Sequence, residues 1–311
     1  MIEIKKYTES DKPVWDDFIS LSKNGNFLFL RDYMDYHKDR FTDHSFIFMK
    51  KNKPIAVLPA NEAEKELISH EGLTFGGLIM HPEIRTTEVL EIFDLLCNYC
   101  VNNGFRTILY KVIPSIFCNY PSEEDLYALF IFKAQPVKRD ISSVVSLQEN
   151  EIHFQGNKRR RAAKCENAGL KMVESTDFTN YWELLTEVLS KFSVKPVHSL
   201  EEITYLKRKM PDKIKLYEAR LNDSLLAGIV IYDYSRVVHT QYMANSVEGR
   251  NMGALDFMNY VLINQVYADR QYYSFGISTE QGGKILNTRL IQQKEEYGGK
   301  GITLDTYRIA L

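Results

Sequence analysis

The sequence has few of the features that mark secreted, disulfide-bonded or membrane-spanning chains. Only four of its 311 residues are cysteines, and their scattered positions do not form a disulfide scaffold. No stretch approaches the roughly 20 apolar residues that a membrane helix needs. The first residues lack the apolar run of a secretory signal. We therefore expect a cytoplasmic protein in a reducing compartment, without a membrane span.

A surplus of charge of either sign is missing as well. The chain has 39 Lys and Arg against 41 Asp and Glu, which gives a net charge of -2. This balance argues against a protein that coats nucleic acid or an anionic membrane, although a local basic cluster can still bind one phosphate group. The apolar fraction of 44% is enough for substantial cores, and the length suits two domains.

Metal and nucleotide motifs are also lacking. Cys97 and Cys100 form a C-x-x-C pair, but they lie inside a predicted helix without the second pair that a zinc site needs. The sequence has no Walker loop, no G-x-S-x-G and no H-E-x-x-H. We therefore predict no metal and no tightly bound cofactor.

What the sequence does contain is one order of elements that occurs twice. Each half is predicted to run strand, two helices, three antiparallel strands, long helix, strand, helix, strand, from the periodicity of its apolar residues. A meander followed by β-α-β units implies an α/β fold, with a mixed sheet flanked by helices in each domain. We place the boundary in the polar stretch near residue 150, giving domains 1–150 and 151–311. The alternative is a single large domain in which the repeated order of elements is a coincidence.

A phosphate site is predicted in the second half, at residues 242–254. Small and polar residues lead there from a strand into a long helix predicted at 252–269, and a helix start offers unpaired N–H groups and a partial positive charge. Gly249 and Gly253 would allow a pyrophosphate to approach the backbone. An ordinary turn is the alternative. The predicted cofactor-binding residues are Gly249, Arg250, Asn251, Gly253 and Ala254.

The corresponding turn of the first half, His81–Arg85, has no glycine. Pro82 removes one N–H donor from it. If only one half binds a phosphate-bearing co-substrate, the second half is the better candidate.

The one dense basic cluster lies on the predicted helix at 157–168. Arg160 and Lys164 share a face of this helix, and Arg161 lies beside them. Guanidinium groups suit a phosphate or carboxylate of the substrate, while a solvated helix face is the alternative.

Acyl transfer to an amine needs a proton acceptor, a group that polarises the carbonyl, and a proton donor for the leaving group. His239 and Gln241 lie two apart on a predicted strand, so we expect both to face one side. Glu248 lies in the following turn, and Tyr297 is a candidate general acid. His198, in a loop before a helix, could line the substrate site. Packed or surface positions are the alternatives for each histidine.

Several short segments resemble the tandem-GNAT proteins related to the Fem-type peptidyltransferases. These segments are Trp15 with Phe18 and Ser22–Gly25, Val57–Asn61, Gly72–Gly77, Arg159–Arg161 with Gly169, Tyr273–Gly276, and above all Leu290–Gly299. The resemblance spans most of the chain, and the order of the motifs carries its weight. It implies two GNAT domains.

The resemblance also implies roles for individual residues. Arg161 aligns with the family's basic position for substrate phosphate, and Lys294 with its lysine before the glycine pair. The acetyltransferase motif Q/R-x-x-G-x-G/A is half met by Arg250–Leu255. Fem-type enzymes use aminoacyl-tRNA, whereas other tandem-GNAT relatives are expected to use acyl-CoA on nucleotide-linked sugars or other amines. Only a short helix pair at 181–209 stands where some Fem enzymes insert a coiled-coil arm, which disfavours tRNA.

Three hypotheses follow. The first is an N-acyltransferase that uses acyl-CoA as co-substrate, with an amine acceptor such as a nucleotide-linked sugar or a cell-envelope precursor. The second is an aminoacyl-tRNA-dependent transferase of the Fem type, and the third is a non-catalytic binding protein. The oligomeric state is left open. The predicted catalytic residues are His239, Tyr297 and Glu248, and the predicted substrate-binding residues are Arg160, Arg161, Lys164, His198, Gln241 and Lys294.

Overall fold

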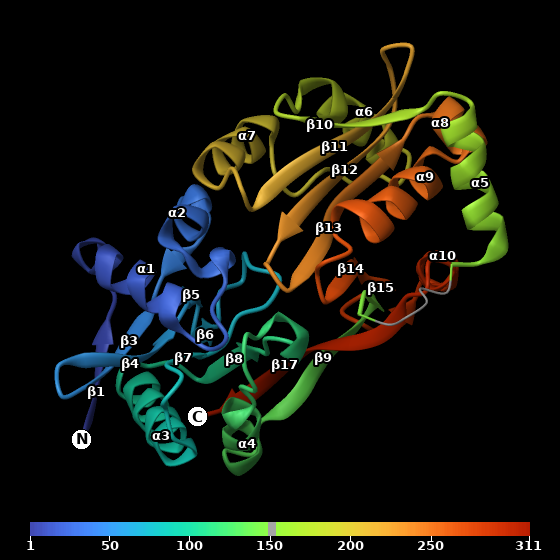
Figure 1. Cartoon of the computed structure of the whole chain (residues 1–311). Helices are drawn as coiled ribbons and strands as arrows, with labels where there is room; N and C mark the ends of the chain where they lie inside the picture. The colour runs from blue at the N-terminus through green and yellow to red at the C-terminus, as the bar shows by residue number, and fades with distance from the viewer. Residues whose placement is uncertain (149–153) are drawn as a thin grey trace. The chain divides into compact units, whose positions relative to one another are not determined.

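The computed structural model describes residues 1–148 and 154–311, so most of the predicted linker at 148–151 lies outside it. Its residues form two compact units (Figure 1). The first unit comprises Met1–Asp140, Gln281–Lys284 and Thr303–Leu311, and the second comprises Ile141–Glu280 and Ile285–Ile302. None of the helices in the described ranges has the length and apolar character of a bilayer-spanning segment.

The C-terminal strand differs from the prediction. We expected residues 302–309 to close the second domain, but β17 (Lys300–Ala310) pairs antiparallel with β8 (Thr107–Lys111), from Thr306 opposite Lys111 to Ala310 opposite Thr107. Residues 303–311 therefore belong to the first unit. The predicted division into 1–150 and 151–311 did not include this pairing of the C-terminal strand with the first unit. An apolar pattern identifies a strand but does not identify its partner.

The first unit has two sheets where we expected one. One is antiparallel, in the order β1-β3-β4-β7, and the other, in the order β2-β5-β6-β8 with β17 beyond, is mixed because β6 and β8 are parallel. The strand bounds are β1 Ile2–Lys6, β2 Thr42–Asp43, β3 Phe46–Lys50, β4 Lys53–Leu58, β5 Asn61–Ala63, β6 Glu66–Ile68 and β7 Ile79–Met80. The helices are α1 (Lys12–Leu21), α2 (Arg31–Met34), α3 (Thr86–Asn102) and α4 (Glu124–Ile131). The predicted apolar stripe of α3 is buried, which confirms its place in the core.

A buried tyrosine of β8 makes two hydrogen bonds in the first unit. The buried Tyr110 of β8 donates its Oη proton to Asp125 Oδ2 (2.7 Å) and accepts from the Leu78 N–H (2.6 Å). Gly77 makes room for this ring, since a Cβ there would lie 2.9 Å from Tyr110 Oη. The Tyr110 hydroxyl thus links β8 to α4 and to the residue that precedes β7.

The second unit is built on a mixed sheet. Its order is β10-β11-β12-β13-β14, followed by the end of β9, and β13 and β14 are its one parallel pair in the described part of the chain. The strands are β9 (Gln135–Ser146), β10 (Lys171–Ser175), β11 (Ile214–Leu221), β12 (Ser224–Asp233), β13 (Val237–Asn245) and β14 (Tyr272–Ile277). The predicted α/β class, with mixed sheets flanked by helices, is confirmed.

Helices cover both faces of this second sheet (Figure 1). On one face α5 (Gly156–Asn167) and α9 (Ala254–Val261) pack into an apolar core with Ile229 and Val238. On the other face α6 (Thr179–Ser190) packs on β12 and β13, and α7 (Leu200–Lys209) follows it. Gly228 permits the close approach of α6, because a Cβ there would lie 2.3 Å from the Tyr181 ring.

The long helix predicted at 252–269 is interrupted. The chain forms α8 (Val247–Met252), turns at Gly253 with a φ of 95°, continues as α9, and ends in a π-helical turn at Leu262–Val266. At Gly253 a Cβ would lie 3.2 Å from Arg161 Cβ. The glycine is therefore needed for a left-handed backbone and for the close approach of α5.

Candidate active site

The strands β13 and β14 separate in the middle of the second sheet. They pair over only three positions, the last being His239 opposite Ser274. A bulge follows in β13 at Gln241, since Val230 pairs with Tyr242 but Ile231 pairs with Thr240. Beyond this point β13 pairs only with β12, and Ile277 of β14 pairs with β9. Bulges often lie beside functional sites, because they end pairing and redirect side chains.

Lys294 lies at the free end of β14. It belongs to α10 (Thr288–Glu295), and its Nζ donates to the carbonyls of Gly276 (2.9 Å) and Ile277 (2.6 Å). The residue is 3% exposed, and burial lowers the pKa of its ammonium to about 8. Among the described residues no carboxylate pairs with it. A lysine has three N–H donors, so two are used here and one has no partner within residues 1–148 and 154–311.

The glycine pair after α10 sets the position of Lys294. Gly298 has a φ of 90°, and the Gly299 N–H donates to the Lys294 carbonyl (3.1 Å). A Cβ on Gly299 would lie 2.8 Å from that carbonyl oxygen. Gly298 therefore ends the helix in the left-handed manner that glycine adopts easily, and Gly299 is needed for the close approach to the Lys294 carbonyl.

His239 lies next to Lys294. Its Nδ1 is 3.1 Å from Ser274 Oγ, and its Cε1 would lie 3.2 Å from a Cβ on Gly276. Burial and the Lys294 charge lower the pKa of His239 to about 4. The imidazole is therefore neutral at pH 7. Its assignment as a catalytic base stays a prediction, and its low pKa makes it a weak base.

A buried carboxylate that the sequence reasoning missed joins α9, α5 and the turn that follows α10. Asp256 of α9 accepts from Tyr297 Oη (2.5 Å), lies 3.0 Å from Lys158 Nζ, and lies 3.4 Å from NH1 of Arg161. Lys158 is also 3.2 Å from Glu296 Oε2. An acidic residue in the first turn of a helix usually indicates only a favourable dipole interaction, so the sequence carried no signal for this network.

The network bears on the predicted role of Tyr297. Its ring is buried and stacked on Phe275, with centroids 5.4 Å apart. Burial and the Asp256 carboxylate raise the pKa of the phenol well above its usual value. Because the hydroxyl proton is held by Asp256, Tyr297 is a poor proton donor in this geometry. Tyr297 lies one helical turn from Lys294, and its N–H donates to the Lys294 carbonyl (3.2 Å).

A small pocket of about 90 Å³ opens beside Asp256. Its lining includes three cationic residues, Lys158, Arg161 and Arg250, and one carboxylate, that of Asp256. Four predicted residues therefore meet here, namely Arg161, Arg250, Gly253 and Tyr297. The remaining lining residues are Asn245, Leu255 and Gln293. Guanidinium groups around a small pocket suit a phosphate or carboxylate group.

Three main-chain N–H groups of the predicted phosphate loop are used within a short helix. Residues 247–252 are helical, and the Gly249 N–H donates to Ser246 Oγ (3.0 Å). The Arg250 and Gly253 N–H groups donate to the carbonyls of Ser246 and Gly249. A Cβ on Gly249 would lie 2.1 Å from the Leu226 carbonyl oxygen, so this glycine serves helix-on-strand packing. The other predicted loop residues are placed outside the pocket: Glu248 and Asn251 are exposed, and Ala254 is buried.

The remaining predicted residues are dispersed. Arg160 and Lys164 are exposed on α5, and Arg160 Nε donates to the Gly156 carbonyl (3.1 Å), as on a solvated helix face. His198 is buried, with its Nδ1 2.7 Å from Tyr242 Oη. Gln241 is the extra residue of the bulge, so the alternation that placed it on one side with His239 is interrupted.

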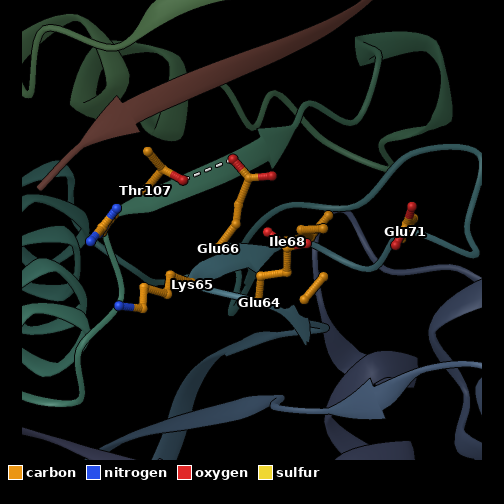
Figure 2. A pocket seen from close by; sticks show the side chains of 8 residues that line it. Glu64, Lys65, Glu66, Ile68, Glu71 and Thr107 are labelled. Carbon is orange, nitrogen blue, oxygen red and sulfur yellow. Dashed lines mark hydrogen bonds between the residues drawn. The ribbon is translucent and has the colours of Figure 1, made fainter.

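A larger hollow of about 780 Å³ lies in the first unit, on β5, β6 and β8 (Figure 2). Thr107 Oγ1 donates to Glu66 Oε1 (2.8 Å), and the lining contains three glutamates together with Lys65 and Arg106. None of the predicted site residues lines this hollow. Its residues are Ala63, Glu64, Lys65, Glu66, Ile68, Glu71, Arg106 and Thr107. The predicted site residues, among them His239 and the buried Lys294, lie in the second unit together with the buried Asp256.

Solved structures share this fold over nearly the whole chain. FemX matches with a TM-score of 0.70 at 11% identity, over 99% of this chain and 97% of FemX. The C-terminal domain of a putative lysylphosphatidylglycerol synthetase from Agrobacterium fabrum matches with a TM-score of 0.63 at 10% identity, over 97% and 92% of the two chains. A tandem GNAT protein from the clavulanic acid biosynthesis pathway matches with a TM-score of 0.53 at 9% identity, over 100% and 98%.

These matches confirm the tandem-GNAT, Fem-like resemblance at the level of the fold. No family model matches the sequence, and no curated protein sequence does either.

Proposed function

We propose that this protein is an acyltransferase that moves an acyl or aminoacyl group from a phosphate-bearing donor to an amine. The observation that carries the proposal is the buried Lys294 ammonium, held by two main-chain carbonyls at the point where β13 and β14 have separated. A buried cation without a carboxylate partner is costly to keep. Strongly perturbed groups of this kind cluster at functional sites.

The chemistry requires three proton or charge events. The amine nitrogen attacks the carbonyl carbon, negative charge collects on the carbonyl oxygen, and the bond to the leaving oxygen or sulfur breaks. The remaining N–H of Lys294 can stabilise that oxyanion. With a pKa of about 8, the same ammonium can also protonate the leaving group near neutral pH. Neutral His239 would accept a hydrogen bond from the incoming amine, and the proton that the nitrogen loses as the amide forms would pass to Lys294 after it has protonated the leaving group.

The pocket beside Asp256 supports a donor that carries phosphate. Arg161 and Arg250 line it, together with the buried Lys158. The main-chain N–H groups of Gly249, Arg250 and Gly253 are already used within α8, so these three would not bind the phosphate, whereas the cationic side chains would. Both acyl-CoA and aminoacyl-tRNA meet this description. The acceptor would be an amine such as a nucleotide-linked sugar or a cell-envelope precursor.

Calorimetry separates the two donors. We expect acetyl-CoA or charged tRNA to bind, and the double variant Arg161→Ala/Arg250→Ala to weaken binding at least tenfold. Binding to tRNA would fall steeply with salt because counterions are released, whereas acetyl-CoA binding would respond less. If neither ligand binds the folded protein at millimolar acetyl-CoA or micromolar tRNA, the proposal fails and a non-catalytic binding role remains.

The role of Lys294 is tested with the donor that binds. Lys294→Met should abolish transfer to an amine while leaving donor binding within about twofold, because the cation acts on the developing charge. Lys300→Met is the matched control, since Lys300 is an exposed lysine of the same unit. Equal activity of the two variants would contradict the assignment.

A further inference from the structure

Tyr297 links the two ends of the Lys294 side chain. At the backbone end, the Tyr297 N–H donates to the Lys294 carbonyl (3.2 Å). At the ammonium end, the Tyr297 ring stacks on Phe275 of β14, with ring centroids 5.4 Å apart. Phe275 directly precedes Gly276 and Ile277, the two residues whose carbonyls accept from the lysine. One aromatic residue therefore joins the end of α10 to the segment of β14 that binds the ammonium.

Asp256 fixes the orientation of the Tyr297 ring. The Tyr297 Oη donates to Asp256 Oδ1 (2.5 Å), and Asp256 is 5% exposed on α9. A hydrogen bond to a carboxylate is roughly twice as strong as one between neutral groups. Lys158 of α5 supports this contact, because its Nζ lies 3.0 Å from the Asp256 carboxylate and 4.8 Å from the centre of the Tyr297 ring. The phenol ring is therefore held by groups on α5 and α9.

These charged side chains are not themselves partners of Lys294. In the part of the chain that the structure describes, neither Asp256 nor Lys158 forms a hydrogen bond or an ion pair with it. The Lys158 ammonium is paired instead with Asp256 and Glu296. The network therefore reaches Lys294 through Tyr297 and the adjacent Glu296. Supporting contacts of this kind hold a functional group to within about 0.5 Å of its working position.

We propose that Tyr297 and Asp256 are positioning residues that hold the Lys294 ammonium where β13 and β14 separate. This inference rests on the proposed function, in which Lys294 stabilises the oxyanion. The phenol of Tyr297 stays protonated and donates to Asp256, while its ring fixes the segment of β14 that binds the ammonium. A displacement of about 1 Å at such a site can lower the rate about 100-fold.

The first test measures the pKa of Lys294 in the ligand-free protein, by NMR of isotope-labelled lysine assigned with Lys294→Arg. Wild type should titrate near 8. Tyr297→Phe removes one oxygen atom and loosens the β14 segment, so water reaches the ammonium and its pKa should rise toward 10.5. Asp256→Ala should act in the same direction. Asp256→Asn should keep the wild-type pKa, because its amide oxygen can still accept from Tyr297.

Tyr217→Phe is the matched control. Tyr217 is buried in the core of the same unit, and its Oη lies 3.1 Å from Tyr267 Oη. This variant loses a buried phenol hydrogen bond as Tyr297→Phe does, but it lies outside the network, so the pKa of Lys294 should equal that of wild type. The neighbouring His239 has a pKa of about 4 and is therefore neutral throughout the titration.

The second test measures transfer with the donor that binds. In Tyr297→Phe, kcat should fall about 100-fold, and the pKa near 8 in its pH profile should rise as the NMR value does. An unchanged Lys294 pKa or an unchanged kcat in Tyr297→Phe, or an equal change in Tyr217→Phe, would overturn the positioning role. Inactive Lys294→Met would then leave the proposed function standing. If Lys294→Met kept its activity, the proposed function would fail, and the NMR result alone would decide the positioning role.

Discussion

The burial of Lys294 makes the stability of the protein depend on pH in a definite way. Its pKa falls from 10.5 to about 8 on folding because burial penalises the charged form. At about 1.4 kcal/mol per pKa unit, a protonated Lys294 costs the folded protein about 3 kcal/mol near pH 7. Between pH 8 and pH 10.5 the unfolded chain binds more protons than the folded protein. Stability from this group must therefore rise with pH across that window.

The variant Lys294→Met removes this dependence. Urea unfolding at pH 7, 8, 9 and 10 should show wild type gaining about 2.5 kcal/mol relative to the variant between pH 7 and pH 10. The variant also leaves the carbonyls of Gly276 and Ile277 without their donor, which costs about 1–3 kcal/mol at every pH. The change with pH in the difference between the two unfolding free energies therefore tests the pKa of Lys294. A difference that is constant with pH does not.

The control is the exposed Lys300→Met, whose stability curve should run parallel to that of wild type. Titration of other lysines and tyrosines affects all three proteins alike and cancels in the differences. If the Lys294→Met and wild-type curves were parallel from pH 7 to pH 10, Lys294 would not be buried as a cation. The proposed catalytic role of Lys294 would then be refuted.

Three further outcomes are expected from urea unfolding. Burial raises the pKa of Asp125 from 3.8 to about 6, so wild type should lose about 3 kcal/mol relative to Asp125→Asn between pH 3 and pH 7; a constant difference would contradict this. Gly253→Ala should cost more than Gly169→Ala, because both have positive φ but only Gly253 has a side chain within 4 Å of the added Cβ. Equal losses of unfolding free energy in the two variants would show that α5 shifts to make room for the added Cβ. Tyr297→Phe should cost about 1–3 kcal/mol, because the buried Asp256 loses a hydrogen bond, and an unchanged midpoint would mean that the bond contributes nothing.

Local patterns were enough for the elements that carry the fold. The apolar stripe of α3 appears at helical spacing and is buried as predicted. The hairpin of β11 and β12 turns at Asn222-Asp223, which both adopt positive φ. In such cases the burial of one face decides the structure, and the sequence records which face it is.

Distant contacts were not predictable in the same way. Gly249 suggested a phosphate loop, yet its reason is the Leu226 carbonyl on β12, which no local pattern reveals. Asp256 and Lys158 lie almost 100 residues apart and meet only after α5 packs on α9. The position of Lys294 was indicated by family resemblance, while its bonds to β14 required the structure.

The two units differ in how they use a buried lysine, and this difference favours the second unit as the place of chemistry. In the first unit Lys111 Nζ donates to the carbonyls of His70 (3.0 Å), Glu71 (3.3 Å) and Leu73. Burial, with a smaller contribution from Lys138, lowers its pKa to about 7. Its three donors are all engaged in holding the turn after β6, so none remains for a substrate. Lys294, by contrast, has one donor left where β13 and β14 have separated.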